Sequence, residues 1–217
     1  MKKLIFIIAG ALMTVAPNWQ AWAAAPKFVT PAPLKFTPPN GSKQVLANGL
    51  TVWLLEDNTL PMIRAFALIK AGSLYDPKDK IGLADMTADA MRLGGTKKYP
   101  ADTLNESLEA TGSSIESGMS GEYASASMFA LTANAPAVMA MFADMLQNPA
   151  FEPAKIEILR AQYLESLLRR NDSPNSAANR EGERRFFGAD SPFGWRAESG
   201  TINAITLADM NGYYSSY

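Results

Sequence analysis

The stretch GLADMTADAMRLGGT, residues 82–96, decides how the rest of this chain is interpreted. Its apolar residues recur at the spacing of an amphipathic helix: Leu83, Met86, Ala90 and Met91. Gly94-Gly95 follows them, and glycine is typical of a helix C-terminus. Asp85 and Asp89 are four residues apart and therefore share one face. The stretch predicts a short helix with two carboxylates on one side.

The size and charge of the chain set broad limits on its class. Its 217 residues suit one large domain or one half of a duplicated protein, with ample length for a core. The formal net charge is −1, so the chain lacks the basic surplus typical of proteins that bind nucleic acid or anionic membranes. We therefore expect no nucleic-acid partner.

The first 23 residues have the features of a signal peptide. Lys2 and Lys3 precede an apolar run over 4–15, and Ala21-Trp22-Ala23 offers a small-x-small cleavage site. Cleavage near Ala23 predicts a periplasmic or secreted protein without a membrane anchor; the alternative is an uncleaved anchor. Because cysteine is absent, lipoprotein attachment and disulfides are excluded. Residues 24–42 are rich in proline and predict an extended lead-in.

Histidine is also absent from the chain. Catalytic zinc sites in proteins nearly always include histidine, as do Ser-His-Asp triads and Cys-His dyads. The chain by itself therefore cannot assemble any of these sites in its ordinary form.

The order of strand and helix signals predicts an α+β domain over residues 43–217. Asn48-Gly49 between two apolar runs predicts a β-hairpin over 43–55. The nearly continuous apolar run 62–71 predicts a third strand buried on both faces. Further strands are expected over 113–116 and 122–131, and helices over the ranges 82–93, 101–110, 134–146, 153–170 and 175–187. Visible hairpin connections favour a largely antiparallel sheet with helices on one face.

Smaller signals complete this pattern. Asp79 lies where the helix of residues 82–93 could begin, and Thr206-Leu-Ala-Asp209 resembles a capping box that opens a last helix. The chain stops soon after, at Tyr217, which suggests that a second homologous domain follows in the complete protein. No glycine-rich phosphate loop or internal repeat is present in the sequence.

In this order, the motifs resemble those of the insulinase/pitrilysin family of zinc metallopeptidases, which carry His-x-x-Glu-His. The resemblance covers about residues 43–217. Its landmarks, in sequence order, are Leu46-x-Asn48-Gly49-Leu50-x-Val52, Gly72-Ser-x-x-Asp76-Pro, Gly82-Leu-Ala, Gly95-Thr96, the stretch 151–174 and Gly188-x-x-Ser-Pro-Phe-Gly194. The resemblance implies the fold of insulinase and the mitochondrial processing peptidases.

The resemblance also implies that the catalytic residues are missing. The two zinc histidines of the family correspond to Asp85 and Asp89, and the catalytic glutamate corresponds to Ala88. The third ligand, a glutamate on the long downstream helix, corresponds to Ser166, or to Glu165 if the register slips by one. Without a base at position 88, no group can take a proton from a metal-bound water. We therefore expect no catalytic residue and no cofactor in this chain.

Degenerate members of the family pair with an active partner, and the two enclose a chamber for unfolded peptides. The resemblance thus implies a non-catalytic, N-terminal domain that partners a zinc-bearing homologue, its own second domain, or both, in a heterodimer that takes part in proteolysis. Two alternatives stay open: an active metallopeptidase with an unusual carboxylate site, and a stand-alone binding or scaffold module of the envelope.

Several local features have competing interpretations. Asp85, Asp89 and Glu165 could hold Ca²⁺ or Mg²⁺ through oxygen ligands, or could be solvated carboxylates. The strand at 122–131 could present an edge to peptides or lie inside the sheet. The charged segment 180–185 predicts a solvated helix face or a partner contact. An aromatic cluster is expected either to anchor a loop in the core or to form a peptide pocket: Phe186, Phe187, Phe193 and Trp195.

Overall fold

The computed structural model describes residues 40–217. The expected signal peptide (1–23) and most of the expected lead-in (24–42) lie outside the described residues. The chain divides into two compact units, residues 1–56 and residues 57–217, which we describe separately.

The described part of the first unit is a β-hairpin, as the sequence predicts. Strands β1 (Ser42–Val45) and β2 (Thr51–Leu54) pair antiparallel, with Val45 opposite Thr51. The turn depends on Asn48-Gly49: Gly49 has φ +87°, and the Leu50 N–H donates to Asn48 Oδ1 at 3.1 Å. Asparagine and glycine are the residues that tolerate this backbone conformation, which is why the dipeptide marks the turn.

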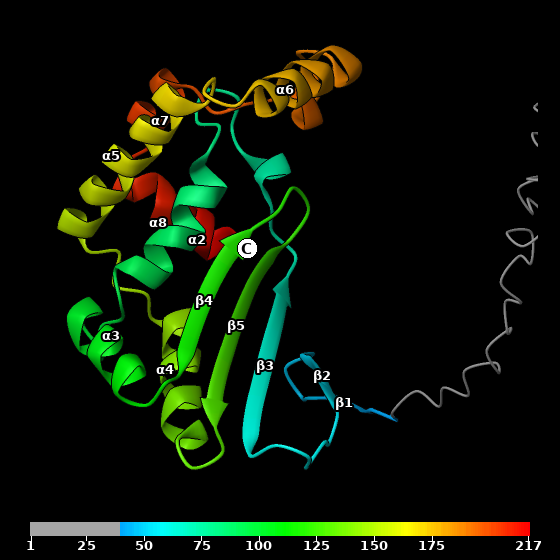
Figure 1. Ribbon diagram of the computed structural model, residues 1–217, viewed down its shortest axis with the longest axis vertical. Coiled ribbons are helices and arrows are strands. Elements are labelled where there is room, and N and C mark those ends of the chain that lie inside the picture. Colours follow the sequence, from blue (N-terminus) through cyan, green and yellow to red (C-terminus); the bar gives the residue numbers. More distant parts are fainter. Residues whose placement is uncertain (1–39) are drawn as a thin grey trace, which may run out of the picture. The chain divides into compact units, whose positions relative to one another are not determined.

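The second unit is built on a three-stranded antiparallel sheet (Figure 1). The strands are β3 (Met62–Ile69), β4 (Ser114–Met119) and β5 (Ala124–Leu131), in the spatial order β3-β5-β4. Met62 lies opposite Leu131, and Ser114 lies opposite Phe129. The central position of β5 decides between the two interpretations of residues 122–131: this strand is internal and has no free edge.

Helices make up most of the remainder, which confirms the α+β class. They are α2 (Leu83–Leu93), α3 (Ala101–Ala110), α4 (Ala135–Gln147), α5 (Pro153–Arg169), α6 (Pro174–Phe187), α7 (Ser199–Ala204) and α8 (Leu207–Ser216), with single 3₁₀ turns η2 (Ser73–Tyr75) and η3 (Pro192–Gly194). The capping box at Thr206 and Asp209 opens α8 as expected. Helix α7 was not expected; its six residues are too few to show a helical period.

Two groups of buried side chains hold the second unit together. One joins the inner face of the sheet to α3 and α4, with Leu104, Ile115, Met128 and Phe142 among its members. The other joins α2, α5, α7 and α8, with Met86, Ile156, Ile202 and Met210 among its members. Helix α2 contacts β4, α5 and α8, so it connects the sheet to the C-terminal helices.

Strand β3 is not buried on both faces, and that prediction was wrong. Ala65 and Ala67 pack on the inner group, whereas Phe66 and Leu68 point to the opposite face and are 66% and 65% exposed. On that face their cross-strand neighbours are Ser127 and Ser125. Serine is too small to cover a phenylalanine or leucine, and β3 lies at the edge of the sheet (Figure 1).

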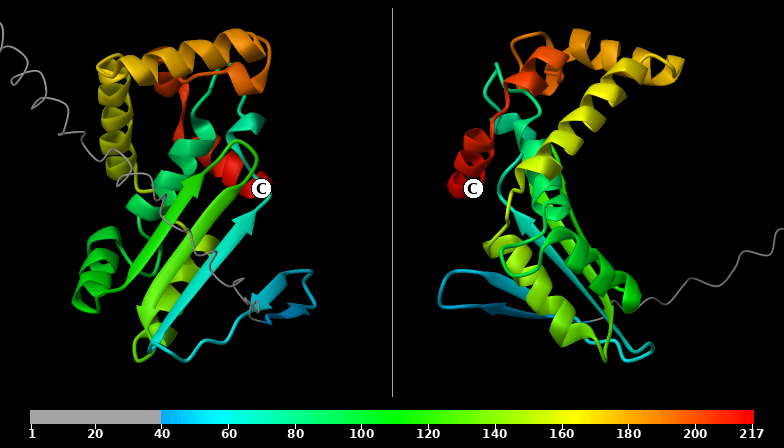
Figure 2. Two further views of the ribbon diagram at one scale, coloured as in Figure 1. Left: turned by 45° about the vertical axis from the view of Figure 1, so that its right-hand side comes forward. Right: turned by 90° about the vertical axis from the view of Figure 1, so that its left-hand side faces the viewer.

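Helices α5 and α6 meet at a sharp corner at the end of the second unit (Figure 2). Helix α6 has no buried residue and packs mainly on η3. Leu168 of α5 is 81% exposed next to this corner. Within residues 40–217, no helix combines the length and the apolar character needed to span a membrane.

Candidate functional site

Helix α2 is anchored at its N-terminus by Asp76 from the preceding loop. The buried Asp76 carboxylate accepts hydrogen bonds from the Gly82 N–H at 2.7 Å and the Ala84 N–H at 2.8 Å. These amides have no partner within the helix, and a carboxylate also complements the positive end of the helix dipole. Asp79, the residue suggested by the sequence, is exposed and does not cap the helix.

The carboxylates of Asp85 and Asp89 lie on one side of α2, as the four-residue spacing predicts. Both residues are half-buried, and the Tyr163 hydroxyl of α5 donates to Asp89 Oδ2 at 2.6 Å. Burial raises the pKa of Asp85 to about 6, and the negative charges of Asp76 and Asp89 act in the same direction. Burial also raises the pKa of Tyr163, with its hydrogen bond to Asp89 as the next cause. This tyrosine is therefore a hydrogen-bond donor, not a base.

Ala88 occupies the position where the family resemblance places the catalytic glutamate. It is 3% exposed, and its carbonyl oxygen accepts a hydrogen bond from Ser117 Oγ of β4 at 2.6 Å. A methyl group cannot accept a proton. This part of α2 packs against the sheet and offers no acid–base chemistry.

Neither candidate for the third ligand completes the site. Glu165 is exposed and pairs with Arg169 one turn further along α5, with 2.9 Å between Oε1 and the guanidinium. Ser166 is exposed and donates to the Tyr163 carbonyl oxygen at 3.0 Å. The α5 side chain that hydrogen-bonds to an α2 carboxylate is Tyr163, which was not among the site residues expected from the sequence. The only sequence signal for this role is the hydroxyl group of Tyr163, which can donate a hydrogen bond.

The residues around α2 do not fit a zinc ion. Across the described part of the chain, no group of three or more His, Cys, Asp or Glu side chains is placed to hold a metal. Asp85 and Asp89 supply carboxylates only, and one oxygen of Asp89 is bound to Tyr163. A zinc site uses at least three protein ligands, which is more than this pair provides.

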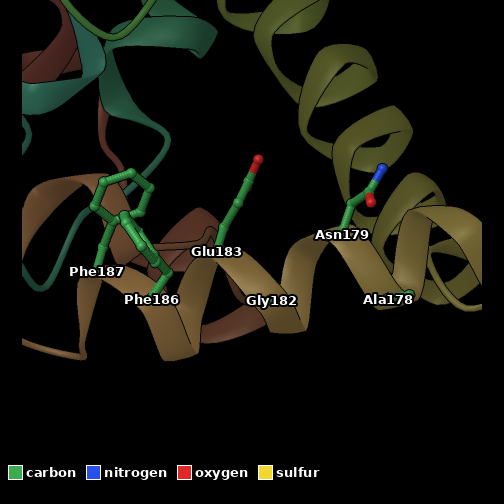
Figure 3. A pocket seen from close by; sticks show the side chains of 6 residues that line it. All are labelled: Ala178, Asn179, Gly182, Glu183, Phe186 and Phe187. Atoms are coloured by element: carbon green, nitrogen blue, oxygen red, sulfur yellow. The ribbon is translucent and has the colours of Figure 1, made fainter.

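The aromatic cluster is a surface feature and does not anchor a loop in the core. Phe186 is 80% exposed, and its ring packs edge-to-face on Phe187, with centroids 4.9 Å apart. Phe187 in turn contacts Phe193, at 5.5 Å between centroids. Phe186 and Phe187 also line a shallow surface pocket along α6, and Asn179 and Glu183 project from the same helix (Figure 3). The residues that line this pocket are Ala178, Asn179, Gly182, Glu183, Phe186 and Phe187.

The charged face of α6 is solvated, as the simpler interpretation predicts. Arg184 and Arg185 both pair with Glu181, and Arg196 pairs with Glu183. Arg180 donates to the Arg170 carbonyl oxygen at 3.0 Å and so helps to hold the corner between α5 and α6. Because these charges are paired within the segment, they give no sign of a particular partner.

Comparison with known proteins identifies the class. The profile of insulinase (Peptidase family M16) matches residues 52–181, more than half of the chain. The chain therefore belongs to the insulinase family, as the sequence motifs predict.

Its relatives include proteins with different roles. Cytochrome b-c1 complex subunit 1 of Bos taurus mitochondria is 25% identical over 173 residues, which are 79% of this chain and 36% of that protein. Mitochondrial-processing peptidase subunit beta of Dictyostelium discoideum is 26% identical over 147 residues, 67% of this chain and 30% of that protein. The chain thus spans about a third of the length of these relatives.

Solved structures show the same fold. An inactive M16 peptidase domain from Pseudomonas fluorescens superposes with a TM-score of 0.74 at 24% identity, covering 81% of this chain and 43% of that one. The periplasmic protease PqqL from Escherichia coli gives 0.69 at 20% identity, covering 82% and 21%.

Proposed function

We propose that this chain is a non-catalytic domain of a periplasmic insulinase-family peptidase, and that it forms a peptide-binding chamber with a zinc-bearing homologue. The observation that carries this proposal is the buried Ala88 between Asp85 and Asp89 on α2. These residues stand where the family's base and two zinc histidines are expected; Ala88 cannot act as that base, and Asp85 and Asp89 are too few to hold a zinc ion.

The loss of catalysis follows from chemistry. Peptide hydrolysis by a zinc enzyme needs a metal to lower the pKa of a bound water and a base to take its proton. Here α2 lacks the ligands for zinc and has alanine at the position of the base, and neither Glu165 nor Ser166 completes a zinc site. The helix keeps a structural role, because Met86 and Ala90 remain buried in the core.

Partner and location are inferred from the relatives and from the first residues of the chain. The similarity to the mitochondrial-processing peptidase subunit and to a periplasmic protease supports a role within a larger assembly. The signal-peptide pattern of residues 1–23 supports export to the periplasm. The zinc-bearing partner would be a separate homologue, a second domain of the complete protein, or both.

A peptidase assay on the purified chain tests the catalytic part of the proposal. We expect no metal-dependent cleavage of an unfolded peptide library and less than stoichiometric zinc by elemental analysis. Turnover that needs metal and is abolished by Asp89→Ala would contradict the proposal. The partner part is tested by affinity purification from the native host. Recovery of the chain without any His-x-x-Glu-His homologue would instead favour the stand-alone scaffold.

A further inference from the structure

We propose that Asn40-Gly41 is a site of spontaneous deamidation, at which Asn40 is converted to aspartate and isoaspartate, and that the folded chain protects its other two Asn-Gly dipeptides. These are Asn48-Gly49 and Asn211-Gly212. The three dipeptides are identical, so a difference in reactivity has to come from the contacts around them. Each of those contacts lies within a single unit of the chain. This modification is independent of the proposed function.

Deamidation at Asn-Gly is an intramolecular reaction that needs no enzyme. The backbone nitrogen of the glycine loses its proton to water or hydroxide and attacks the side-chain Cγ of the asparagine. The bond from Cγ to Nδ2 breaks, ammonia leaves, and a five-membered succinimide ring remains. Water then opens the ring at one carbonyl to give aspartate, or at the other to give isoaspartate. Glycine favours ring closure because it has no Cβ to block the approach and its backbone turns freely.

Neither reacting group of Asn40-Gly41 is held by a hydrogen bond. The Leu46 N–H donates to the Leu50 carbonyl oxygen at 2.8 Å, so the even-numbered residues of β1 bond to β2. The N–H of Gly41, an odd-numbered residue, points away from β2. Among residues 40–217, no group is hydrogen-bonded to the Asn40 side chain or to the Gly41 N–H. Ring closure therefore begins there without the loss of a contact.

Glycine at position 41 has a packing reason of its own. A Cβ at this position would lie 3.3 Å from the Leu54 carbonyl oxygen of β2, which is closer than ordinary van der Waals contact. A side chain would therefore crowd the second strand of the hairpin. The packing of the hairpin thus favours the residue that makes Asn40 reactive.

The Asn48-Gly49 dipeptide is held at both reacting groups. The Gly49 N–H donates to the Leu46 carbonyl oxygen at 2.9 Å, and the Leu50 N–H donates to Asn48 Oδ1 at 3.1 Å. Ring closure requires both bonds to break, which opens the turn between β1 and β2. A turn opens at a lower free energy than an element of the core. Deamidation at Asn48 is therefore slowed by the turn but not prevented.

Helix α8 protects Asn211-Gly212 more strongly. Asn211 Nδ2 donates to the Leu207 carbonyl oxygen at 2.9 Å, and the helical pattern occupies the Gly212 N–H. The next residue, Tyr213, is buried, and its hydroxyl both accepts from the Gly72 N–H and donates to the Gly72 carbonyl oxygen at 2.9 Å. Ring closure requires this turn of α8 to unfold together with its core contact. Asn211 is therefore the slowest of the three.

The modification changes the chain just before the hairpin. Both products replace a neutral amide with a carboxylate, so the chain gains one negative charge at position 40. Isoaspartate also routes the main chain through Cβ and Cγ, which adds one carbon to the backbone two residues before β1. Ageing of the chain thus alters the segment that leads into β1 and leaves the two protected dipeptides unchanged for longer.

Incubation of the purified full chain in mildly alkaline buffer tests the proposal. Trypsin places the three dipeptides on separate peptides, 36–43, 44–64 and 197–217, in which tandem mass spectrometry locates each converted residue.

We expect Asn40 to deamidate at least about tenfold faster than Asn48, and Asn48 faster than Asn211. In urea, where the turn and the helix are lost, the three rates should converge. The control variant Asn40→Gln should show almost no conversion at position 40, because ring closure from glutamine needs a six-membered ring.

Equal rates at the three dipeptides of the folded chain, or faster conversion at Asn48 or Asn211, would overturn the proposal. So would an Asn40 that stays intact in the folded chain and reacts in urea, because a contact would then protect it. A ranking that stays unchanged in urea would overturn it as well, since flanking sequence and not folded contacts would set the rates. None of these measurements involves peptidase activity or a partner, so their failure is distinct from failure of the proposed function.

Discussion

The Tyr163 hydroxyl of α5 donates a 2.6 Å hydrogen bond to the Asp89 carboxylate of α2, at a position where the family resemblance places a zinc histidine. This hydrogen bond links helices α2 and α5 directly. The pair is half-buried, and hydrogen bonds to a charged acceptor are stronger than neutral ones. The bond therefore contributes to packing between α2 and α5.

Removing the tyrosine hydroxyl should cost stability. We expect Tyr163→Phe to lower the free energy of unfolding by about 1.5–3 kcal/mol, because the Asp89 carboxylate loses a donor in a half-buried site. Urea denaturation measures the change. The matched control is Tyr214→Phe, whose hydroxyl donates to the uncharged Leu146 carbonyl oxygen at 2.9 Å; it should cost about 0.5–1.5 kcal/mol. Additive effects of Tyr163→Phe and Asp89→Asn would show that the two residues are not coupled.

Asp85 should make stability depend on pH. The pKa of Asp85 is about 6 in the folded chain against an ordinary value of 3.8. Between these two pH values the folded chain therefore keeps a proton on Asp85 that the unfolded chain has released. Stability therefore falls as pH rises from 4 to 6. Above pH 6 Asp85 is charged, and the full cost of burying that charge is present. Asp85→Asn should raise the free energy of unfolding by about 1–3 kcal/mol at pH 8.

The size of that gain should itself depend on pH. The difference between Asp85→Asn and the unchanged chain should shrink below pH 6 and vanish near pH 4, as followed by denaturation at several pH values. The exposed Asp172→Asn is the matched control and should leave the pH profile unchanged. A gain from Asp85→Asn that is constant across this range would show that charge is not its cause.

The cap at the start of α2 depends on Asp76. Asp76→Ala removes the acceptor of both the Gly82 and Ala84 N–H groups, and we expect a loss of about 2–3 kcal/mol. Asp79→Ala changes an exposed aspartate three residues later and should stay within about 0.5 kcal/mol. Thermal unfolding of the two variants distinguishes them. Equal losses would indicate that the helix begins differently.

Proline substitution tests the alternation of hydrogen bonds along β3. Ala67 bonds to β5, so Ala67→Pro should cost about 3 kcal/mol or more. The Leu68 N–H points away from β5, so Leu68→Pro breaks no bond of this ladder and should cost far less, and Leu68→Ala accounts for the lost side chain. Chemical denaturation gives the order. A larger cost at 68 than at 67 would contradict this alternation of hydrogen bonds between β3 and β5.

Local patterns were sufficient for most helices and strands. The period of apolar residues places α2 and α3, and Asn48-Gly49 places the hairpin between β1 and β2, because these signals act over a few neighbouring residues. The capping box at Thr206 is of the same kind. Helix α7 was not predicted because its six residues, fewer than two helical turns, are too few to show a period.

Long-range packing could not be predicted in the same way. The apolar run of β3 indicated burial on both faces, but an apolar side chain is covered only if a large neighbour stands opposite, and here the neighbours are Ser125 and Ser127. The phenylalanines near α6 indicated a core anchor, yet Phe186 packs on Phe187 at the surface. In both cases the side chains are apolar, but no large side chain covers them.

The sequence by itself determined the family and the chemistry that positions 85, 88 and 89 provide, because ordered motifs and residue types need no coordinates. Only the tertiary structure decided what those positions do. It brings Tyr163 to Asp89, buries Ala88 against the sheet and leaves Glu165 paired with Arg169. The physical reason is that the first two contacts join α2 to α5 and β4, which lie far apart in the chain, and their geometry depends on the packing of whole helices.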